Sequence, residues 1–262
     1  MRLGYCSAVA TSSRSRVAWL VGGHPFDAPA LRAMIDTIPA VVEIIAWPEA
    51  GSFFSPTGVE TLLNDYDVLA LYDMPGIGLN RGATPEPLEV HPDVIDAWKV
   101  LLQAGMPILG VHHAIASWPK WPGFAEILKG RFHYVPAELR GVSWPDSGYA
   151  MNVQQTFEVV QPAHPVCAGL PPTFSLRDET YLCPLFDSET TVLVTTDAIM
   201  NDSNHQSSLA AVRREEATGW SHPSGSRAVA WTHTFDKSTI VYLQPGDGAD
   251  AFDNVVYRRM IA

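Results

Sequence analysis

The chain has 262 residues, enough for one large α/β domain or two small ones, and 47% of them are hydrophobic, as in ordinary globular proteins. Its net charge of −11, from 17 basic and 28 acidic side chains, argues against a nucleic-acid or anionic-membrane partner, because both require a basic face on the protein. The three cysteines show no spacing typical of a disulfide framework or a metal site, which favours a reducing compartment.

No apolar stretch resembles a signal peptide or reaches the length of a membrane span. We therefore expect a cytoplasmic protein in which residues 1–15 form a flexible amino-terminal extension and residues 16–262 form a single domain. The absence of an internal repeat and of a low-complexity linker favours one domain over two.

Apolar strand-like runs and helical periodicities alternate along the first half of the chain. Successive strand–helix units predict an α/β fold with a doubly wound, mostly parallel sheet covered on both faces. The strand-like runs cover residues 17–21, 41–47, 67–72 and 106–111. The helical patterns cover residues 29–38, 57–63 and 92–104, and Gly105 ends the last of them.

The second half of the chain is less regular. Residues 118–148 are rich in Trp, Pro and Gly and are predicted to form loops. Short β-like runs follow at residues 156–160, 191–195, 228–232 and 239–243, and a last helix begins near Asp250. We expect these extra strands to finish the sheet while the loops surround the site.

The segment Gly110-Val111-His112-His113-Ala114, called the elbow below, has the shape of a nucleophile elbow, in which small residues let a strand and a helix pack closely. An imidazole stands where Ser or Cys would be expected. Because imidazole titrates near neutral pH, it suits proton transfer better than acyl-enzyme formation. The alternative is that both histidines are ordinary loop residues beside a strand end.

Other polar residues follow neighbouring strands of the predicted sheet. His24 comes after a Gly-Gly turn that lets backbone approach a ligand, and Asp73 ends the third strand. The carboxyl ends of parallel strands share one edge of a sheet, so segments 22–26, 72–76 and 110–114 are expected to meet there. His24, Asp73, His112 and His113 would then line one crevice. No dinucleotide fingerprint or phosphate-binding loop is present.

Several motifs, taken in order, resemble the ThuA-like (trehalose utilisation) family, a branch of the class I glutamine amidotransferase-like fold. The resemblance covers roughly residues 16–262. The motifs are Gly22-Gly23-His24, Gly110-Val111-His112, Ser117-Trp118-Pro119-Lys120-Trp121, Gly130-Arg131-Phe132-His133, His164-Pro165, Gly169-Leu170-Pro171, Asp178-Glu179-Thr180-Tyr181, Ala230-Trp231-Thr232-His233 and Tyr242-Leu243-Gln244-Pro245-Gly246.

The resemblance implies a flavodoxin-like sheet in which His112 occupies the slot of the amidotransferase cysteine. Glutamine hydrolysis through a thioester is therefore not expected. One departure stands out, because many relatives carry Gly-His after the late strand whereas this chain has Gly246-Asp247-Gly248. Either the role of that histidine is lost here or Asp247 acts in a different way.

The family is tied to the catabolism of carbohydrates, often of oxidised (keto) sugars, which implies acid–base chemistry beside a carbonyl such as isomerisation, elimination or hydrolysis. His112 would remove a proton, and a second histidine or a metal would stabilise the enediolate. The catalytic candidates are His112, His24, Asp178, Glu179 and His233. The candidates for binding a carbohydrate-like substrate are Asp73, His113, Trp118, His133 and Tyr181. At most one of the adjacent carboxylates Asp178 and Glu179 is expected to face the substrate.

Two other functions stay open. A divalent-metal-dependent hydrolase or lyase would use His24, His113, His133 and His233 with one carboxylate, although no spacing along the chain marks such a site. A non-catalytic sugar-binding or regulatory domain would have kept the scaffold and lost the nucleophile. The enzyme is favoured because many titratable groups are predicted at one sheet edge. A homo-oligomer is left open.

Overall fold

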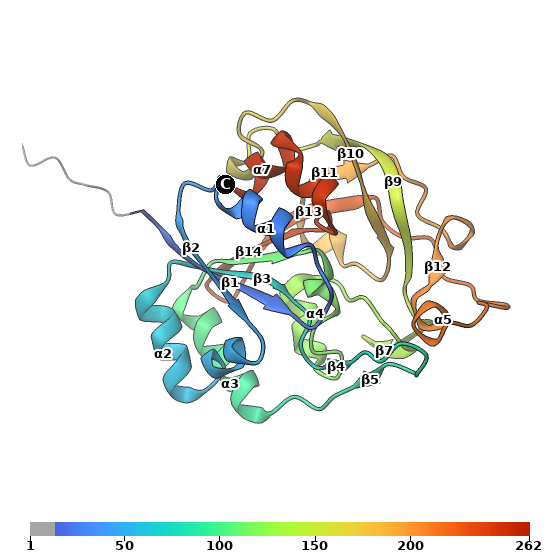
Figure 1. The fold of residues 1–262 in the computed structure, drawn as a ribbon, viewed down its shortest axis with the longest axis horizontal. Coiled ribbons are helices and arrows are strands. Elements are labelled where there is room, and N and C mark those ends of the chain that lie inside the picture. Colours follow the sequence, from blue (N-terminus) through green and yellow to red (C-terminus); the bar gives the residue numbers. More distant parts are fainter. Residues whose placement is uncertain (1–13) are drawn as a thin grey trace, which may run out of the picture.

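The computed structural model describes residues 14–262 (Figure 1), so most of the predicted flexible extension lies outside the described residues. Within residues 14–262, a ten-stranded sheet forms the centre of the molecule, in the order β10-β9-β11-β13-β14-β6-β3-β1-β2, with β12 beside β9. Its strands come from both halves of the chain. The bounds of the parallel strands are Arg16–Gly22 (β1), Val41–Ala46 (β2), Val68–Asp73 (β3), Ile108–Val111 (β6) and Ser238–Leu243 (β14).

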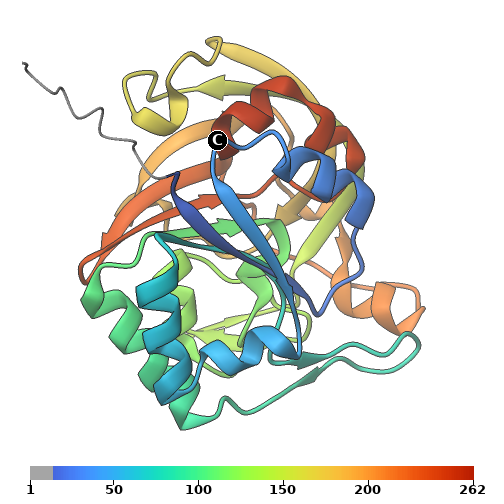
Figure 2. The ribbon, with the colours of Figure 1, turned by 60° about the vertical axis from the view of Figure 1, so that its left-hand side comes forward.

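Helices cover both faces of the parallel part of the sheet (Figure 2). The apolar side chains of β1 alternate between the two layers, with Leu20 in one core and Trp19 in the other. One layer contains Pro56–Asp65 (α2), Pro92–Ala104 (α3) and Pro122–Leu128 (α4). The other contains Ala28–Ile35 (α1), Ala249–Asp253 (α6) and Val255–Ile261 (α7).

The elements predicted for the first half are confirmed, and their ends follow local signals. In α3, Pro92 occupies the first turn and the ring of His91 accepts a hydrogen bond from the backbone N–H of Asp93. Gly105 ends the helix with φ 84°, a left-handed conformation that glycine adopts without strain. Trp98 and Leu101 lie on its buried face, as the helical spacing indicates.

The second half adds antiparallel strands to the sheet. The strands predicted from residue 156 onward are confirmed, but Thr173–Leu182 (β10) was not predicted. Its partner strand β9 is much longer than the predicted run and spans Gly148–Val159. The other two antiparallel strands of this part are Thr191–Thr196 (β11) and Ala228–Phe235 (β13).

Residues 118–148 were predicted as loops, and this prediction is wrong in two places. Pro122 begins α4, and Phe124 and Leu128 lie on its buried face. A short hairpin follows, formed by Ala137–Leu139 (β7) and Val142–Trp144 (β8). The last helix is also divided, because the side chain of Asn254 caps α7 by accepting from two backbone N–H groups.

The remaining elements lie around the sheet. They are the paired strands Ile77–Gly78 (β4) and Glu86–Pro87 (β5), the short strand Gln206–Ser207 (β12) and the helix Ser208–Arg213 (α5). Single 3-10 turns cover Glu49–Phe53, His112–Ala116, Pro165–Cys167, Asp187–Glu189 and Asp202–Asn204. Among the described residues, no helix is both long and apolar enough to cross a membrane.

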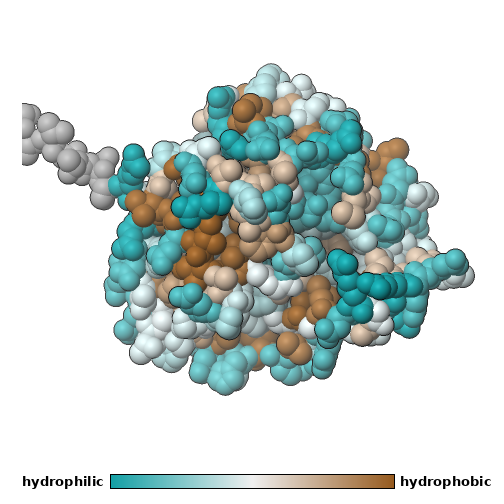
Figure 3. Space-filling model, in the orientation of Figure 1, coloured by the Kyte–Doolittle hydropathy of each residue, from teal (hydrophilic) through white to brown (hydrophobic). Residues whose placement is uncertain are grey.

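The predicted α/β fold class is therefore confirmed, with the extra strands in the second half. Hydrophobic side chains gather over the edge strand β2 on the face in Figure 3, where Val41 is 52% exposed. The strands β1, β3 and β6 lie side by side and parallel, so segments 22–26, 72–76 and 110–114 do meet at one edge. The candidate site is built at this edge.

Candidate functional site

The elbow bends sharply where β6 ends. His112 has φ 49°, a left-handed conformation that costs a residue other than glycine about 1–2 kcal/mol. The surrounding fold holds it there, since the hydroxyl of Tyr242 donates to the carbonyl oxygen of His112 at 2.5 Å. A Cβ atom at Gly110 would lie 3.0 Å from the ring of Tyr242 and 3.2 Å from Leu128. The small residue expected at the start of the elbow is thus required by packing.

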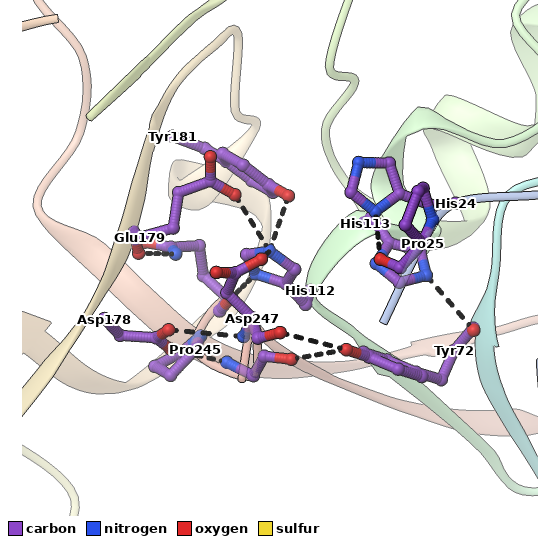
Figure 4. Close-up of polar contacts among 12 residues, drawn as sticks. His24, Pro25, Tyr72, His112, His113, Asp178, Glu179, Tyr181, Pro245 and Asp247 are labelled. Atoms are coloured by element: carbon purple, nitrogen blue, oxygen red, sulfur yellow. Dashed lines mark hydrogen bonds and ion pairs between the residues drawn. The ribbon is translucent and has the colours of Figure 1, made fainter. Parts of the chain in front are cut away.

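The ring of His112 is completely buried, and both of its nitrogens have partners (Figure 4). Its Nδ1–H donates to the carbonyl oxygen of Gln244 at 2.7 Å. Its Nε2 lies 2.7 Å from the hydroxyl of Tyr181 and 3.0 Å from Oε2 of Glu179. Oδ1 of Asp247 is 3.6 Å from the same nitrogen. Two carboxylates and one hydroxyl therefore surround a single ring nitrogen.

This arrangement favours a positive charge on His112. Burial opposes the charge, but the contacts with Asp247 and Glu179 outweigh burial and raise the pKa of His112 to about 10. The imidazolium then donates from both nitrogens, with Glu179 and the Tyr181 hydroxyl as acceptors at Nε2 and Asp247 as a second nearby negative charge. A histidine in this state is a proton donor, so the predicted role of His112 as a base does not follow from the geometry.

The adjacent carboxylates Asp178 and Glu179 point in different directions, as expected. A break in the register of β10 against β9 lies between Asp178 and Thr180, so Glu179 sits at an irregularity of the strand. Glu179 faces His112. Asp178 instead accepts from the backbone N–H of Gly246 at 2.6 Å and of Asp247 at 3.2 Å. Burial raises the pKa of Asp178 to about 6. Asp178 therefore holds the loop that carries Asp247.

His24 and His113 stand on the other side of His112 in Figure 4, with their ring centroids 4.9 Å apart. Burial and the neighbouring histidines lower the pKa of both residues, so both are neutral when His112 is charged. One nitrogen of His113 lies 3.1 Å from the carbonyl oxygen of Tyr72, and its side chain is buried. Nδ1–H of His24 donates to the carbonyl oxygen of Pro25 at 2.8 Å, which leaves Nε2 as an acceptor.

A cavity of about 460 Å³ opens beside these residues, within the range typical of small-molecule sites. Its wall combines polar groups with aromatic and aliphatic side chains. The lining residues are His24, Pro25, Leu79, Arg81, Phe132, Tyr134, Tyr149, Met151, Glu179, Tyr181, Ser208, Ala211, Val212, Arg214 and Asp247. The ring of His112 lies behind Glu179, Tyr181 and Asp247.

Two histidines expected in the site lie elsewhere. His233 pairs with Ile240 at the opposite edge of the sheet, because β13 runs antiparallel to β14 and its last residues return to that edge. The side chain of His133 does not line the cavity, although both its neighbours, Phe132 and Tyr134, do. Its side chain is buried instead, and burial lowers the pKa of the His133 imidazole to about 4.

Trp118 and Asp73 were expected to bind substrate, but both side chains are buried and contact Trp47. Trp118 is 7% exposed and packs edge-on against Trp47, with ring centroids 5.9 Å apart. Nε1–H of Trp47 donates to the carboxylate of Asp73 at 2.6 Å, and burial raises the pKa of Asp73 to about 7. Neither side chain lines the cavity. Of the candidates for substrate binding, Tyr181 is the one that does.

Asp247 is the main site residue that the predicted set lacks. It follows β14, whose carboxyl end lies beside the elbow because Leu243 pairs with Val111. The rule that placed His24 at this edge would have placed Asp247 there too. Tyr134 and Tyr149 carried no such signal, since they reach the cavity from a loop and from an antiparallel strand that starts near it.

The expected metal site of His24, His113, His133 and His233 with one carboxylate is not formed, because His24 and His113 are neighbours whereas His133 and His233 lie elsewhere. Instead, single ligand atoms of His112, Glu179 and Asp247 lie within 4.8 Å of one another. One imidazole and two carboxylates form a donor set that divalent ions accept. The bond from Nδ1–H of His112 to a backbone carbonyl is also the orientation that metal-binding histidines use.

Comparisons with known proteins support the fold. The family model described as "Trehalose utilisation" (ThuA) matches residues 49–262. A ThuA-like protein from Parabacteroides merdae shares 13% identity at a TM-score of 0.64, with 95% of this chain and 88% of that one covered. A ThuA-like protein from Bacteroides uniformis shares 17% identity at a TM-score of 0.63, with 98% and 92% covered.

A cytoplasmic protein from Salmonella typhimurium has the same fold at a TM-score of 0.54 and 13% identity, with 94% of this chain and 96% of that one covered. No curated protein matches the sequence. At these low identities the solved structures show the fold alone.

Proposed function

The chain belongs to the ThuA (trehalose utilisation) family, and we propose that it is an enzyme of carbohydrate catabolism that performs acid–base chemistry on an oxidised (keto) sugar. The observation that carries this proposal is the environment of His112 beside the cavity. A buried imidazole held in a left-handed conformation faces two carboxylates and a tyrosine. Such convergence of titratable groups is typical of sites that transfer protons.

In this proposal the His112 imidazolium acts as the acid. A ketone raises the acidity of the hydrogen on the neighbouring carbon, and the reaction then requires that negative charge on the ketone oxygen be stabilised. Because the His112 ring lies behind Tyr181, the Tyr181 hydroxyl would give its proton to that oxygen and take the Nε2 proton of His112, which lies 2.7 Å away. The carboxylates of Glu179 and Asp247 keep the ring charged at neutral pH, so the proton is present before the substrate binds.

His24 is the group best suited to be the base. It lines the cavity, it is neutral, and its Nε2 carries a lone pair because Nδ1–H is bound to the carbonyl of Pro25. It would take the carbon-bound proton, leave an enediol after donation from His112, and return the proton to either carbon. Return of the proton to the former carbonyl carbon, with the proton of the other enediol hydroxyl passing back to the Tyr181–His112 pair, isomerises the sugar. In an elimination the electrons of the enediolate instead expel a leaving group from the next carbon.

Glutamine hydrolysis is not part of this proposal. A thioester requires a thiolate at the elbow, and His112 occupies that position. Cys183 is buried, and burial raises the pKa of its thiol to about 12. Cys167 is buried in the core between the sheet and α7 and does not line the cavity.

Solvent deuterium exchange tests the proposal. A panel of keto-sugars is incubated with the protein in D₂O, and incorporation at the carbon beside the ketone is followed by NMR. At least one sugar should exchange faster with protein than with buffer alone. His24→Gln should slow that exchange by about 100-fold or more, the usual contribution of a general base. Binding of the same sugars without any exchange would favour the non-catalytic sugar-binding alternative.

A metal-dependent hydrolase or lyase is the second candidate, and the convergence of His112, Glu179 and Asp247 favours it. Two carboxylates facing one buried nitrogen call for a cation between them, which is either the Nε2 proton or a divalent ion. Elemental analysis of the purified protein, followed by chelation, separates the two. A stoichiometric ion whose removal abolishes activity supports the metal-dependent enzyme. Full activity without metal supports a protonated His112 as the cation between the two carboxylates.

A further inference from the structure

Two arginines line the cavity at a distance in sequence from every catalytic candidate. Arg81 lies in the loop between β4 and β5, and Arg214 follows α5. The backbone N–H of Gly82 donates to the carbonyl oxygen of Val212 at 2.7 Å, which ties the two segments together. Figure 3 shows hydrophilic side chains gathered over α5, the region where these segments meet. The two arginines thus line the same cavity from neighbouring segments.

The backbone fixes where each arginine starts. Arg81 lies in a tight turn closed by a hydrogen bond from the N–H of Ala83 to the carbonyl oxygen of Asn80 at 3.0 Å. Arg214 has φ 59°, a left-handed conformation, and its backbone N–H caps α5 by donating to carbonyl oxygens of the helix. A residue other than glycine in this conformation costs about 1–2 kcal/mol. The fold therefore presents both residues at defined places.

Neither arginine has a carboxylate partner among residues 14–262. The neighbouring Arg213 pairs with Glu215 at 2.9 Å, and Arg140 pairs with Glu126 and Glu189. Acidic residues outnumber basic ones by 28 to 17 in this chain, yet this cavity is lined by two arginines that no carboxylate of the described residues neutralises. The two carboxylates of the same cavity, Glu179 and Asp247, are engaged with His112.

We propose that the substrate is an anionic carbohydrate whose carboxylate or phosphate group binds Arg81 and Arg214 while its carbonyl end lies beside Tyr181 and Glu179, in front of His112. Guanidinium groups bind these anions through paired, charge-assisted hydrogen bonds. Leu79 and Met151, apolar residues that line the same cavity, would contact the sugar carbons. The inference rests on the proposed function for the carbonyl end only, because binding of the anion requires no reaction.

Calorimetric titration with glucuronate, glucose 6-phosphate and glucose tests the inference. At low salt at least one anion should bind about tenfold or more tightly than glucose, and added salt should weaken its binding. The tighter of the two anions identifies carboxylate or phosphate as the recognised group. Equal affinity for glucose, or no binding of either anion, overturns the inference.

Variants assign the effect to the two side chains. Arg81→Gln and Arg214→Gln should each weaken binding of the anion by about tenfold and leave binding of glucose unchanged. Arg213→Gln is the matched control, since Arg213 is adjacent in sequence, does not line the cavity and should change nothing. Unchanged affinity in both cavity variants contradicts the inference. Tight anion binding with no deuterium exchange on any sugar would instead reject the proposed reaction and leave the anion site standing.

Discussion

His112 combines three properties that together define the proposed site. It is fully buried, it has a left-handed backbone, and two carboxylates approach its Nε2. Burial and a left-handed backbone would be unfavourable without support from the fold, whereas the two carboxylates explain why the ring is charged. The sequence pattern placed an imidazole at the elbow correctly, but the carboxylates that decide its protonation come from residues 67 and 135 positions away in the sequence.

We expect Glu179→Gln to lower the pKa of His112, because an amide cannot compensate the charge of the imidazolium. NMR titration of the ring nitrogens would show this directly. In the wild type the ring should stay charged through neutral pH, whereas in Glu179→Gln it should lose its proton at a lower pH. An unchanged titration would mean that Glu179 does not hold the charge. Glu189→Gln, an exposed acid in a surface ion pair, is the control.

Asp73 should make the protein less stable as pH rises. Burial raises its folded-state pKa to about 7 from 3.8, so the folded state keeps a proton that the unfolded state loses. The associated stability is complete below about pH 4 and is lost between about pH 4 and 7, with a total of about 4 kcal/mol.

The variant Asp73→Asn cannot ionise, yet its amide oxygen can still accept from Trp47. Urea unfolding at pH 5 and pH 8 should therefore show that Asp73→Asn gains stability relative to the wild type at the higher pH. An equal difference at the two pH values would show that Asp73 does not titrate across this range.

At the scale of elements, the site depends on the contact between β10 and the loop after β14. Asp178 joins them by accepting two backbone N–H groups, and this places Asp247 beside His112. The region is tightly packed, since a Cβ atom at Gly246 would lie 2.8 Å from the hydroxyl of Tyr257 and 2.9 Å from Val111. The loop therefore has little freedom to move away from the elbow.

We expect Asp178→Ala to destabilise the protein by about 1–3 kcal/mol, because two buried N–H groups lose their acceptor. Activity should fall more than binding of the substrate, since Asp247 would be displaced from His112 while the cavity walls stay in place. Thermal unfolding and a comparison of kcat with KM measure the two effects. Wild-type stability in this variant would contradict the role assigned to Asp178.

Sequence periodicity predicted the parallel strands because their residues are apolar on both faces, as β1 and β3 show. It missed β10 because this strand carries Arg177, Asp178 and Glu179, whose charges suggest a turn. Those acids are buried, yet they face the elbow and its loop and not an apolar core. Because this strand faces polar groups of the site, its residues lack the apolar pattern of a buried strand. Asp178 and Glu179 were therefore predicted as site residues, while β10 itself was not predicted.

At the scale of the whole molecule, the carboxyl ends of β1, β6 and β14 lie at one edge of the parallel half of the sheet. The antiparallel half contributes β10, whose Glu179 contacts His112 at this edge. The edge could be inferred from the order of strands and helices in the first half. The closure of the cavity could not, because Tyr149, Met151 and the segment around α5 approach from parts of the chain that carry no strong pattern. His233 shows the same limit, since the direction of β13 moved it to the far edge.

Deuterium exchange in His112→Gln tests whether His112 supplies the proton in the reaction, with His233→Gln as the matched control at the opposite edge of the sheet. The sugar that the wild type exchanges fastest is used, and circular dichroism establishes that each variant is folded. We expect that His112→Gln loses exchange by about 100-fold or more while His233→Gln keeps the wild-type rate. Exchange at the wild-type rate in a folded His112→Gln protein would contradict this expectation.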